Sequence, residues 1–146
     1  MQQKKRLLLL VEDNADDEEM TLRALRKANL ECCTCETVRD GQEALDWVFG
    51  EGRYAGRDTS QQPDLIILDL GLPRVPGLDV LQRIRTDQRL ALTPVVILTS
   101  SLEQKDRLRS YLSGANSYVQ KPVDAGRFSE AVQQLGVYWT SVNERP

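Results

Sequence analysis

Short runs of continuously apolar residues recur along the chain, and each run is followed by a longer amphipathic segment. Such runs occupy residues 7–11, 65–68 and 95–98. A strand without polar residues at alternate positions is buried on both faces, which is typical of parallel sheets that helices cover on both sides. The pattern therefore predicts an α/β fold built from repeated strand–helix units.

Five strand–helix units account for most of the sequence. We expect strands at 6–13, 33–38, 64–70, 93–101 and 117–120, with helices at 14–30, 40–50, 77–88, 102–114 and 124–142. A glycine-rich loop is expected at 51–63, and Asn14 is the expected N-cap of the first helix. A chain of 146 residues can bury a substantial core, so residues 1–146 are predicted to form one doubly wound α/β domain with a five-stranded parallel sheet.

The composition excludes several classes of function. The sequence contains no histidine, so a Ser-His-Asp triad, a Cys-His pair and histidine-ligated zinc are impossible. The formal net charge of −3 gives no general attraction to nucleic acid. Because no apolar run is long enough to span a membrane and no signal peptide is recognisable, we expect a cytoplasmic protein without direct contact to nucleic acid or membrane. Cys32, Cys33 and Cys35 are interpreted as small apolar residues packed in the core.

Polar residues follow four of the predicted strands directly. Glu12 and Asp13 end the first strand, Asp69 ends the third, Thr99 ends the fourth and Lys121 follows the fifth. Ligand sites in open parallel sheets form beyond the carboxyl ends of the strands. We therefore expect these five side chains to lie close together.

Such a cluster points to phosphoryl chemistry. Three neighbouring carboxylates repel one another unless a cation lies among them, and hard oxygen donors suit Mg²⁺, with Mn²⁺ as an alternative. Beside such a metal, Asp69 could attack phosphorus, while Lys121 and Thr99 contact the other oxygens of the transferred group. The sequence thus indicates a site that forms an aspartyl phosphate on Asp69.

Four segments in order, VED, DLIILDLGLPRVPG, VVILTSS and SYVQKPVD, resemble the receiver domain of two-component response regulators. The resemblance spans nearly the whole chain. It implies a flavodoxin-like (βα)5 fold with strand order 2-1-3-4-5. It also implies that Asp69 accepts a phosphoryl group from a phosphohistidine on a sensor histidine kinase, which would supply the histidine that this chain lacks.

The same resemblance implies a metal-ligand set. Glu12 and Asp13 are similar to the acid pair that binds Mg²⁺ in this family. Asp69 and the backbone carbonyl of Gly71 would complete the protein ligands.

Further roles follow from the resemblance. Thr99 resembles the family's switch hydroxyl, Tyr118 its switch aromatic and Lys121 its phosphate-contacting lysine, and Pro122 is expected to follow a cis peptide bond. The loop at 51–63 and the ending VYWTSVNERP look closest to single-domain regulators that pair with bacterial phytochrome kinases. A phytochrome is therefore the expected kinase.

Two alternatives remain open at this point. One is a receiver-like docking module that works without phosphate. The other is an aspartyl-phosphate phosphatase of the haloacid dehalogenase type, which would need a second acid two residues after the nucleophile, where Gly71 stands. The leading hypothesis is a signalling phosphoacceptor, not an enzyme, whose catalysis is limited to its own phosphorylation and dephosphorylation.

The C-terminal segment also predicts self-association. On the last predicted helix one stripe forms the expected core face, comprising Phe128, Ala131, Val132, Leu135, Trp139 and Val142. Val137 lies off this stripe, and Tyr138 lies at its edge. Large aromatic residues so near the end of a receiver domain predict a homodimer formed through the C-terminal half.

Overall fold

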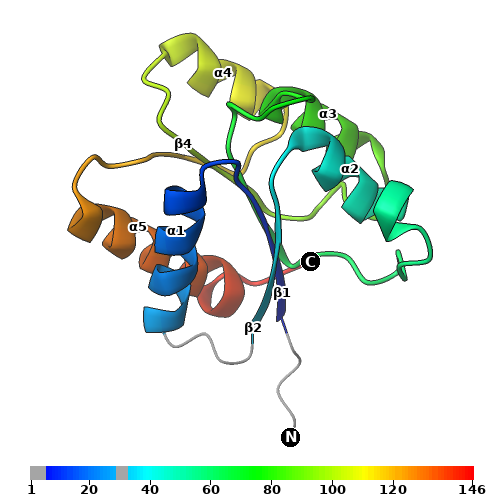
Figure 1. The fold of residues 1–146 in the computed structure, drawn as a ribbon, viewed down its shortest axis with the longest axis horizontal. Coiled ribbons are helices and arrows are strands. Elements are labelled where there is room, and N and C mark those ends of the chain that lie inside the picture. The colour runs from blue at the N-terminus through cyan, green and yellow to red at the C-terminus, as the bar shows by residue number, and fades with distance from the viewer. Residues whose placement is uncertain (1–5, 29–32) are drawn as a thin grey trace, which may run out of the picture.

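The computed structural model describes residues 6–28 and 33–146. Its strands form one parallel sheet in the order β2-β1-β3-β4-β5 (Figure 1). The strands are β1 (Arg6–Val11), β2 (Cys33–Val38), β3 (Leu65–Leu68), β4 (Val95–Thr99) and β5 (Ser117–Gln120). The predicted flavodoxin-like fold and its strand order are confirmed.

Helices cover both faces of the sheet (Figure 1). Helices α1 (Ala15–Lys27) and α5 (Ala125–Val137) pack on one face. Helices α2 (Gly41–Phe49) and α3 (Gly77–Thr86) pack on the other. Helix α4 (Gln104–Leu112) contacts β5 at one side of the sheet.

The central strand β1 shows why its sequence is continuously apolar. Leu8 and Leu10 point into the cluster formed with α1 and α5, where Phe128 is fully buried. Leu9 and Val11 point into the cluster formed with α2 and α3. Each such side chain contributes about 1.5–3 kcal/mol on burial, so both faces of the strand favour the same fold.

Helix α1 begins as predicted. The side chain of Asn14 accepts a hydrogen bond from the backbone N–H of Asp17 at 3.0 Å, which is the expected N-cap. The helix ends at Lys27, and the predicted helical residues 29 and 30 lie outside the described residues, as does Cys32. Cys33 and Cys35 are half-buried and pack against the core on the α1 side.

The last helix differs from its prediction. Helix α5 ends at Val137 and continues as a short π-helical segment, η2 (Tyr138–Val142), in which the N–H of Asn143 donates to the carbonyl of Tyr138 at 2.6 Å. This wider turn rotates the following side chains relative to an α-helix. Trp139 still packs against the core, but Val142 is exposed, so its predicted place on the core face is wrong.

The loop at 51–63 is held by one arginine. It contains a short 3-10 helix, η1 (Gly52–Tyr54), and then Arg57. The Arg57 guanidinium lies 3.7 Å from the centroid of the Trp47 ring and donates to the carbonyl of Gln61 at 2.8 Å. Arg57 therefore links the loop to α2.

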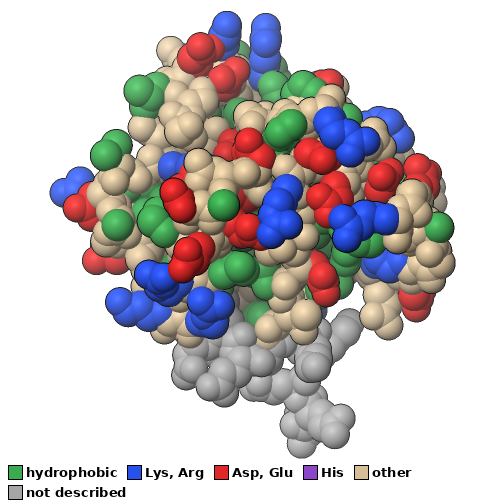
Figure 2. All heavy atoms as spheres, in the orientation of Figure 1, with side chains coloured by type: hydrophobic (Ala, Val, Ile, Leu, Met, Phe, Trp, Pro, Cys, Tyr) green, Lys and Arg blue, Asp and Glu red, His purple; other side chains and the backbone are tan. Residues whose placement is uncertain are grey.

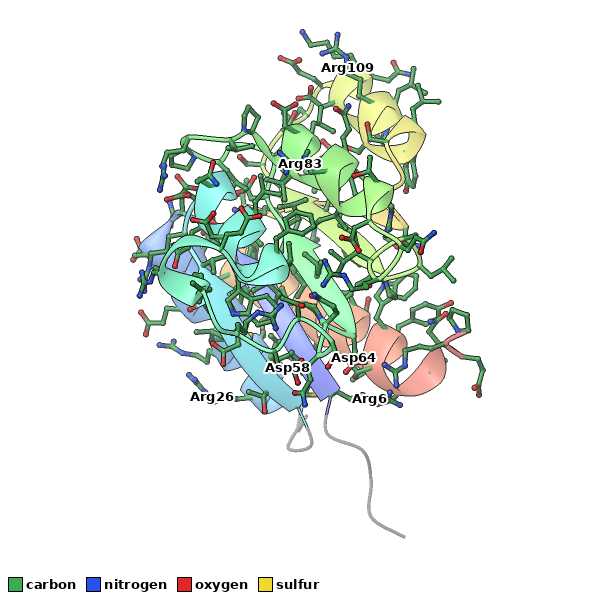
Figure 3. The ribbon with its side chains drawn as sticks, turned by 90° about the vertical axis from the view of Figure 1, so that its right-hand side faces the viewer. Arg6, Arg26, Asp58, Asp64, Arg83 and Arg109 are labelled. Atoms are coloured by element: carbon green, nitrogen blue, oxygen red, sulfur yellow. The ribbon has the colours of Figure 1, made fainter. Side chains whose placement is uncertain are left out.

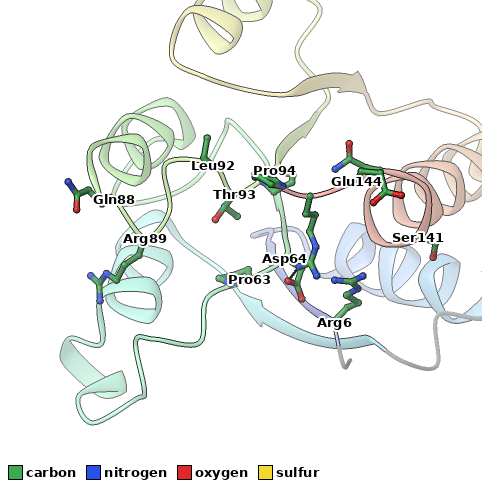
Figure 4. A pocket seen from close by; sticks show the side chains of 13 residues that line it. Arg6, Pro63, Asp64, Gln88, Arg89, Leu92, Thr93, Pro94, Ser141 and Glu144 are labelled. Carbon is green, nitrogen blue, oxygen red and sulfur yellow. Dashed lines mark hydrogen bonds and ion pairs between the residues drawn. The ribbon is translucent and has the colours of Figure 1, made fainter. Parts of the chain in front are cut away.

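The C-terminal residues are attached to the amino end of the sheet. Arg145 forms an ion pair with Asp64, whose other carboxylate oxygen accepts a hydrogen bond from the N–H of Leu7 at 2.8 Å. Figure 3 shows Arg6 and Asp64 together at this end of the molecule. They line a pocket of about 750 Å³ that also includes Thr93 (Figure 4).

Charge on the surface is mixed. Figure 2 shows acidic and basic side chains interspersed across the face it presents, without a broad basic field among the described residues there. In the part of the chain that the structure describes, no helix has the length and apolar character needed to cross a membrane.

Candidate functional site

The carboxyl ends of the strands bring the predicted site residues to one edge of the sheet. Glu12 and Asp69 lie side by side because the register of β1 and β3 pairs Val11 with Leu68. The backbone N–H of Asp69 donates to the carbonyl of Val11 at 3.2 Å, which continues this pairing into the site. The positions of both acids therefore follow from sheet geometry.

Three carboxylates meet at this edge. One oxygen from each of Glu12, Asp13 and Asp69 lies within 4.8 Å of the other two. Glu12 and Asp69 are buried, whereas Asp13 is exposed. Anionic oxygens in this number, with one side open to water, are donors that suit Mg²⁺.

The two buried acids have opposite pKa shifts. Burial, together with the neighbouring Asp69, raises the pKa of Glu12 from 4.5 to about 8 despite hydrogen bonds from Lys121. Burial alone would raise the pKa of Asp69, but Lys121, Glu12 and the N–H of Gly71 together lower it below its ordinary value. At neutral pH Asp69 is thus ionised, as a nucleophile must be.

Lys121 lies at the centre of the cluster, and its side chain is 8% exposed. Its ammonium donates to Asp69 at 2.7 Å, to Glu12 at 2.8 and 3.1 Å, and to Asp17 at 2.8 Å. Burial would lower the pKa of Lys121, but these three carboxylates raise it above its ordinary value. The lysine is therefore a permanent positive charge in the site.

Thr99 and Tyr118 meet at a shared neighbour, Ser101. The buried hydroxyl of Thr99 accepts a hydrogen bond from the N–H of Ser101 at 3.3 Å. The hydroxyl of the half-buried Tyr118 donates to the carbonyl of Ser101, also at 3.3 Å. The backbone N–H of Lys121 donates to the carbonyl of Thr99 at 2.7 Å, which joins β4 and β5 at the site.

Two glycines lie in or against the loop that follows Asp69, and one of them, Gly77, cannot carry a side chain. The N–H of Gly71 donates to a carboxylate oxygen of Asp69 at 3.1 Å. Gly77, which sequence reasoning missed, begins α3 against this loop, and a Cβ there would lie 2.2 Å from the carbonyl oxygen of Asp69 and 2.7 Å from the Cα of Leu70. Only glycine permits this close approach.

The expectation for Pro122 is wrong. The described residues contain no cis peptide bond, so the bond between Lys121 and Pro122 is trans. The trans form of an Xaa–Pro bond is favoured by about 0.5–1 kcal/mol in the absence of other constraints. Lys121 already reaches its carboxylates with this geometry.

Asp17 is a second residue that sequence reasoning missed. It lies in the first turn of α1, and its carboxylate contacts Lys121. The available signal was its place three residues after the N-cap Asn14, on the turn that follows Glu12 and Asp13.

Comparisons with known proteins give a consistent result. The response regulator receiver domain family matches residues 8–133 of this chain. The chain is 36% identical over 141 residues to the probable methanogenesis regulatory protein FilR2 of Methanothrix harundinacea, covering 96% of this chain and 87% of that protein. The chain belongs to the response regulator receiver domain family.

Two solved structures are similar over almost their whole length. The phosphorylated cyanobacterial phytochrome response regulator RcpA has a TM-score of 0.89 and 34% identity, covering 97% of this chain and 99% of that one. The Mn²⁺-bound form of response regulator Rcp1, a protein of Synechocystis, has a TM-score of 0.88 and 30% identity with the same coverage. Receiver domains bind Mg²⁺ or Mn²⁺, and the acidic cluster of this chain has suitable donors.

Proposed function

We propose that the protein is a cytoplasmic signalling switch in which Asp69 accepts a phosphoryl group from a phosphohistidine of a sensor histidine kinase. The observation that carries this proposal is a buried Asp69 carboxylate that contacts the Lys121 ammonium and lies in a cluster with two further acids, Glu12 and Asp13. An oxygen of Asp69 would form a bond to phosphorus as the phosphorus–nitrogen bond breaks. The leaving imidazole keeps the electron pair of that bond and takes up a proton.

The donor set fits a divalent cation. Glu12, Asp13 and Asp69 would hold Mg²⁺ or Mn²⁺, and the backbone carbonyl of Gly71 is the proposed fourth ligand. Burial, together with the neighbouring Asp69, raises the pKa of Glu12, and a bound cation would favour the ionised form of this carboxylate. When bound, such a cation neutralises the phosphoryl oxygens as charge shifts onto them.

Lys121 and Thr99 have complementary roles in this proposal. The ammonium of Lys121 is already within hydrogen-bond distance of Asp69, so it would donate to an oxygen of the phosphoryl group. Thr99 is the last residue of the neighbouring strand β4, and its hydroxyl would donate to a second oxygen of the phosphoryl group. Self-phosphorylation and self-dephosphorylation are the extent of the proposed catalysis.

A polar path connects the site to the surface of α4. Thr99 and Tyr118 both bond to Ser101, so a change at Thr99 would alter the segment that leads into α4. That surface carries the exposed side chains of Leu108, Tyr111 and Leu112. We propose that phosphorylation changes what binds there.

The proposed partners are a kinase and a second copy of the chain. The similarity to the phytochrome response regulator RcpA supports a phytochrome as the kinase. Val137 and Tyr138 are exposed near the C-terminus and support a homodimer formed through that half. A monomer in light scattering at high concentration, both with and without phosphorylation, would rule out this dimer.

The central test is phosphorylation with acetyl phosphate and Mg²⁺, followed by intact-mass measurement. We expect one added phosphoryl group, none in Asp69→Asn and none with EDTA. If the wild type stayed unmodified by acetyl phosphate and by phosphorylated phytochrome kinases, and bound no Mg²⁺, the alternative of a phosphate-independent docking module would be favoured.

A further inference from the structure

Lys121 has as many carboxylate partners as it has N–H donors. An ammonium group carries three N–H bonds, and here they meet Glu12, Asp17 and Asp69. Two of these partners, Glu12 and Asp69, also belong to the candidate metal cluster, whereas Asp17 does not. A divalent cation and the ammonium would therefore share two carboxylates and repel each other across them.

Of the three carboxylates that accept hydrogen bonds from Lys121, only Asp17 lies outside the candidate metal cluster. We propose that Asp17 is a positioning residue that retains Lys121 on the α1 side of the site, so that Glu12 and Asp69 can serve a divalent cation without expelling the ammonium. This inference rests on the proposed metal-dependent function and adds a residue that controls it. Without Asp17, both carboxylates left to Lys121 would be ones that the cation also needs.

The local structure holds Asp17 in place for this role. Its backbone N–H donates to the side chain of Asn14 at 3.0 Å, and its carbonyl accepts a hydrogen bond from the Thr21 hydroxyl at 2.7 Å. Asn14 directly follows Asp13, so the turn that presents one proposed metal ligand also presents Asp17. The Asp17 side chain is 27% exposed, so its carboxylate lies at the rim of the site.

Acids in the first turn of a helix also interact with the helix dipole, and that interaction does not depend on the contact between Asp17 and Lys121. Asp16, Asp17 and Glu18 all lie in the first turn of α1, where the helix dipole favours acids. Asp16 is exposed, and Asp17 is the one whose carboxylate reaches Lys121. Asp16→Asn is therefore a matched control, because it removes the same charge from the same turn.

The experiment is a calorimetric titration of metal-free protein with MgCl₂ at fixed pH and ionic strength. The hydrogen bond between Asp17 and the Lys121 ammonium is charge-assisted but lies at the partly exposed rim of the site, so Asp17→Asn should weaken Mg²⁺ binding about fivefold to tenfold. Asp16→Asn should weaken it less than about twofold, since exposed charges are screened. Urea unfolding checks that both variants remain folded, and Asp17→Asn should lose more stability than Asp16→Asn because only Asp17 contacts Lys121.

A double-mutant cycle tests whether Asp17 acts through the lysine. In a Lys121→Ala background, the effect of Asp17→Asn should fall to that of Asp16→Asn. An effect that persists without Lys121, or equal effects of the two aspartate variants in the wild-type background, would overturn the proposal.

The outcomes separate this inference from the function on which it rests. If the wild type binds Mg²⁺ and is phosphorylated while Asp17→Asn behaves like Asp16→Asn, the role of Asp17 is refuted and the switch stands. If the wild type neither binds Mg²⁺ nor accepts a phosphoryl group, both are refuted.

Discussion

Gly77 offers the sharpest test of how the fold positions the phosphoacceptor. In Gly77→Ala, the new Cβ would lie 2.2 Å from the carbonyl oxygen of Asp69 and 2.7 Å from the Cα of Leu70, where contacts under 3.0 Å are essentially never observed. Both neighbours are backbone atoms, so the start of α3 or the loop carrying Asp69 must move. Overpacking of this kind costs about 1–3 kcal/mol, and alanine returns up to about 1 kcal/mol of helix propensity.

Gly71→Ala is the matched control, because it lies in the same loop and a Cβ there meets no atom within 4 Å. Urea unfolding followed by far-UV circular dichroism should show a net loss of about 1–2 kcal/mol for Gly77→Ala and less than about 0.5 kcal/mol for Gly71→Ala. Phosphorylation by acetyl phosphate should slow in the Gly77 variant, because the Asp69 backbone is displaced. Equal stability of the two variants would refute the close backbone approach.

Two further predictions concern charge and the long loop. The raised pKa of Glu12 means that this carboxyl holds its proton more tightly in the folded protein than in the unfolded chain. The protein without metal should therefore lose stability as the pH rises from 4.5 to about 8. In urea unfolding with EDTA present, Glu12→Gln should make the stability depend less on pH over this range. Stability that rises with pH in this window, or an unchanged slope in the variant, would contradict the assignment. Arg57→Ala removes the contact with Trp47 and should cost about 1–2 kcal/mol while speeding proteolysis in the loop at 51–63. Arg53→Ala, whose side chain is 74% exposed, should be nearly neutral, and similar losses in both would disprove the specific role of Arg57.

The sheet and the acidic cluster were predictable because both follow from short-range rules. Continuously apolar runs specify strands buried on both faces, and a charged residue directly after such a run must lie at the sheet edge. This logic located Glu12, Asp69 and Lys121, whose side chains the structure brings into contact. Their roles in phosphoryl transfer remain a prediction.

Other features depend on the exact direction of side chains or on backbone details that sequence patterns do not carry. Asp17 contacts Lys121 because of the direction in which the first turn of α1 presents its side chain. The spacing of residues in the sequence could not show whether Asp16 or Asp17 would make this contact. Gly77 is needed because a helix begins against a neighbouring loop, a contact between two segments. Val142 left the expected stripe because a π-helical turn changed the helical period after Val137.

The charge balance of the site explains why these details matter. The ammonium of Lys121 contacts the carboxylates of Glu12, Asp17 and Asp69, and Asp13 lies beside two of them, so four carboxylates share one site with this lysine. Burial, together with Asp69, raises the pKa of Glu12 to about 8, so this carboxyl favours its protonated form at neutral pH. Phosphorylation would replace the single negative charge of the Asp69 carboxylate with the up to about two charges of an acyl phosphate, which both the lysine and a divalent cation would help to balance. A separate carboxylate for the lysine, at Asp17, lets the two cations occupy the site together.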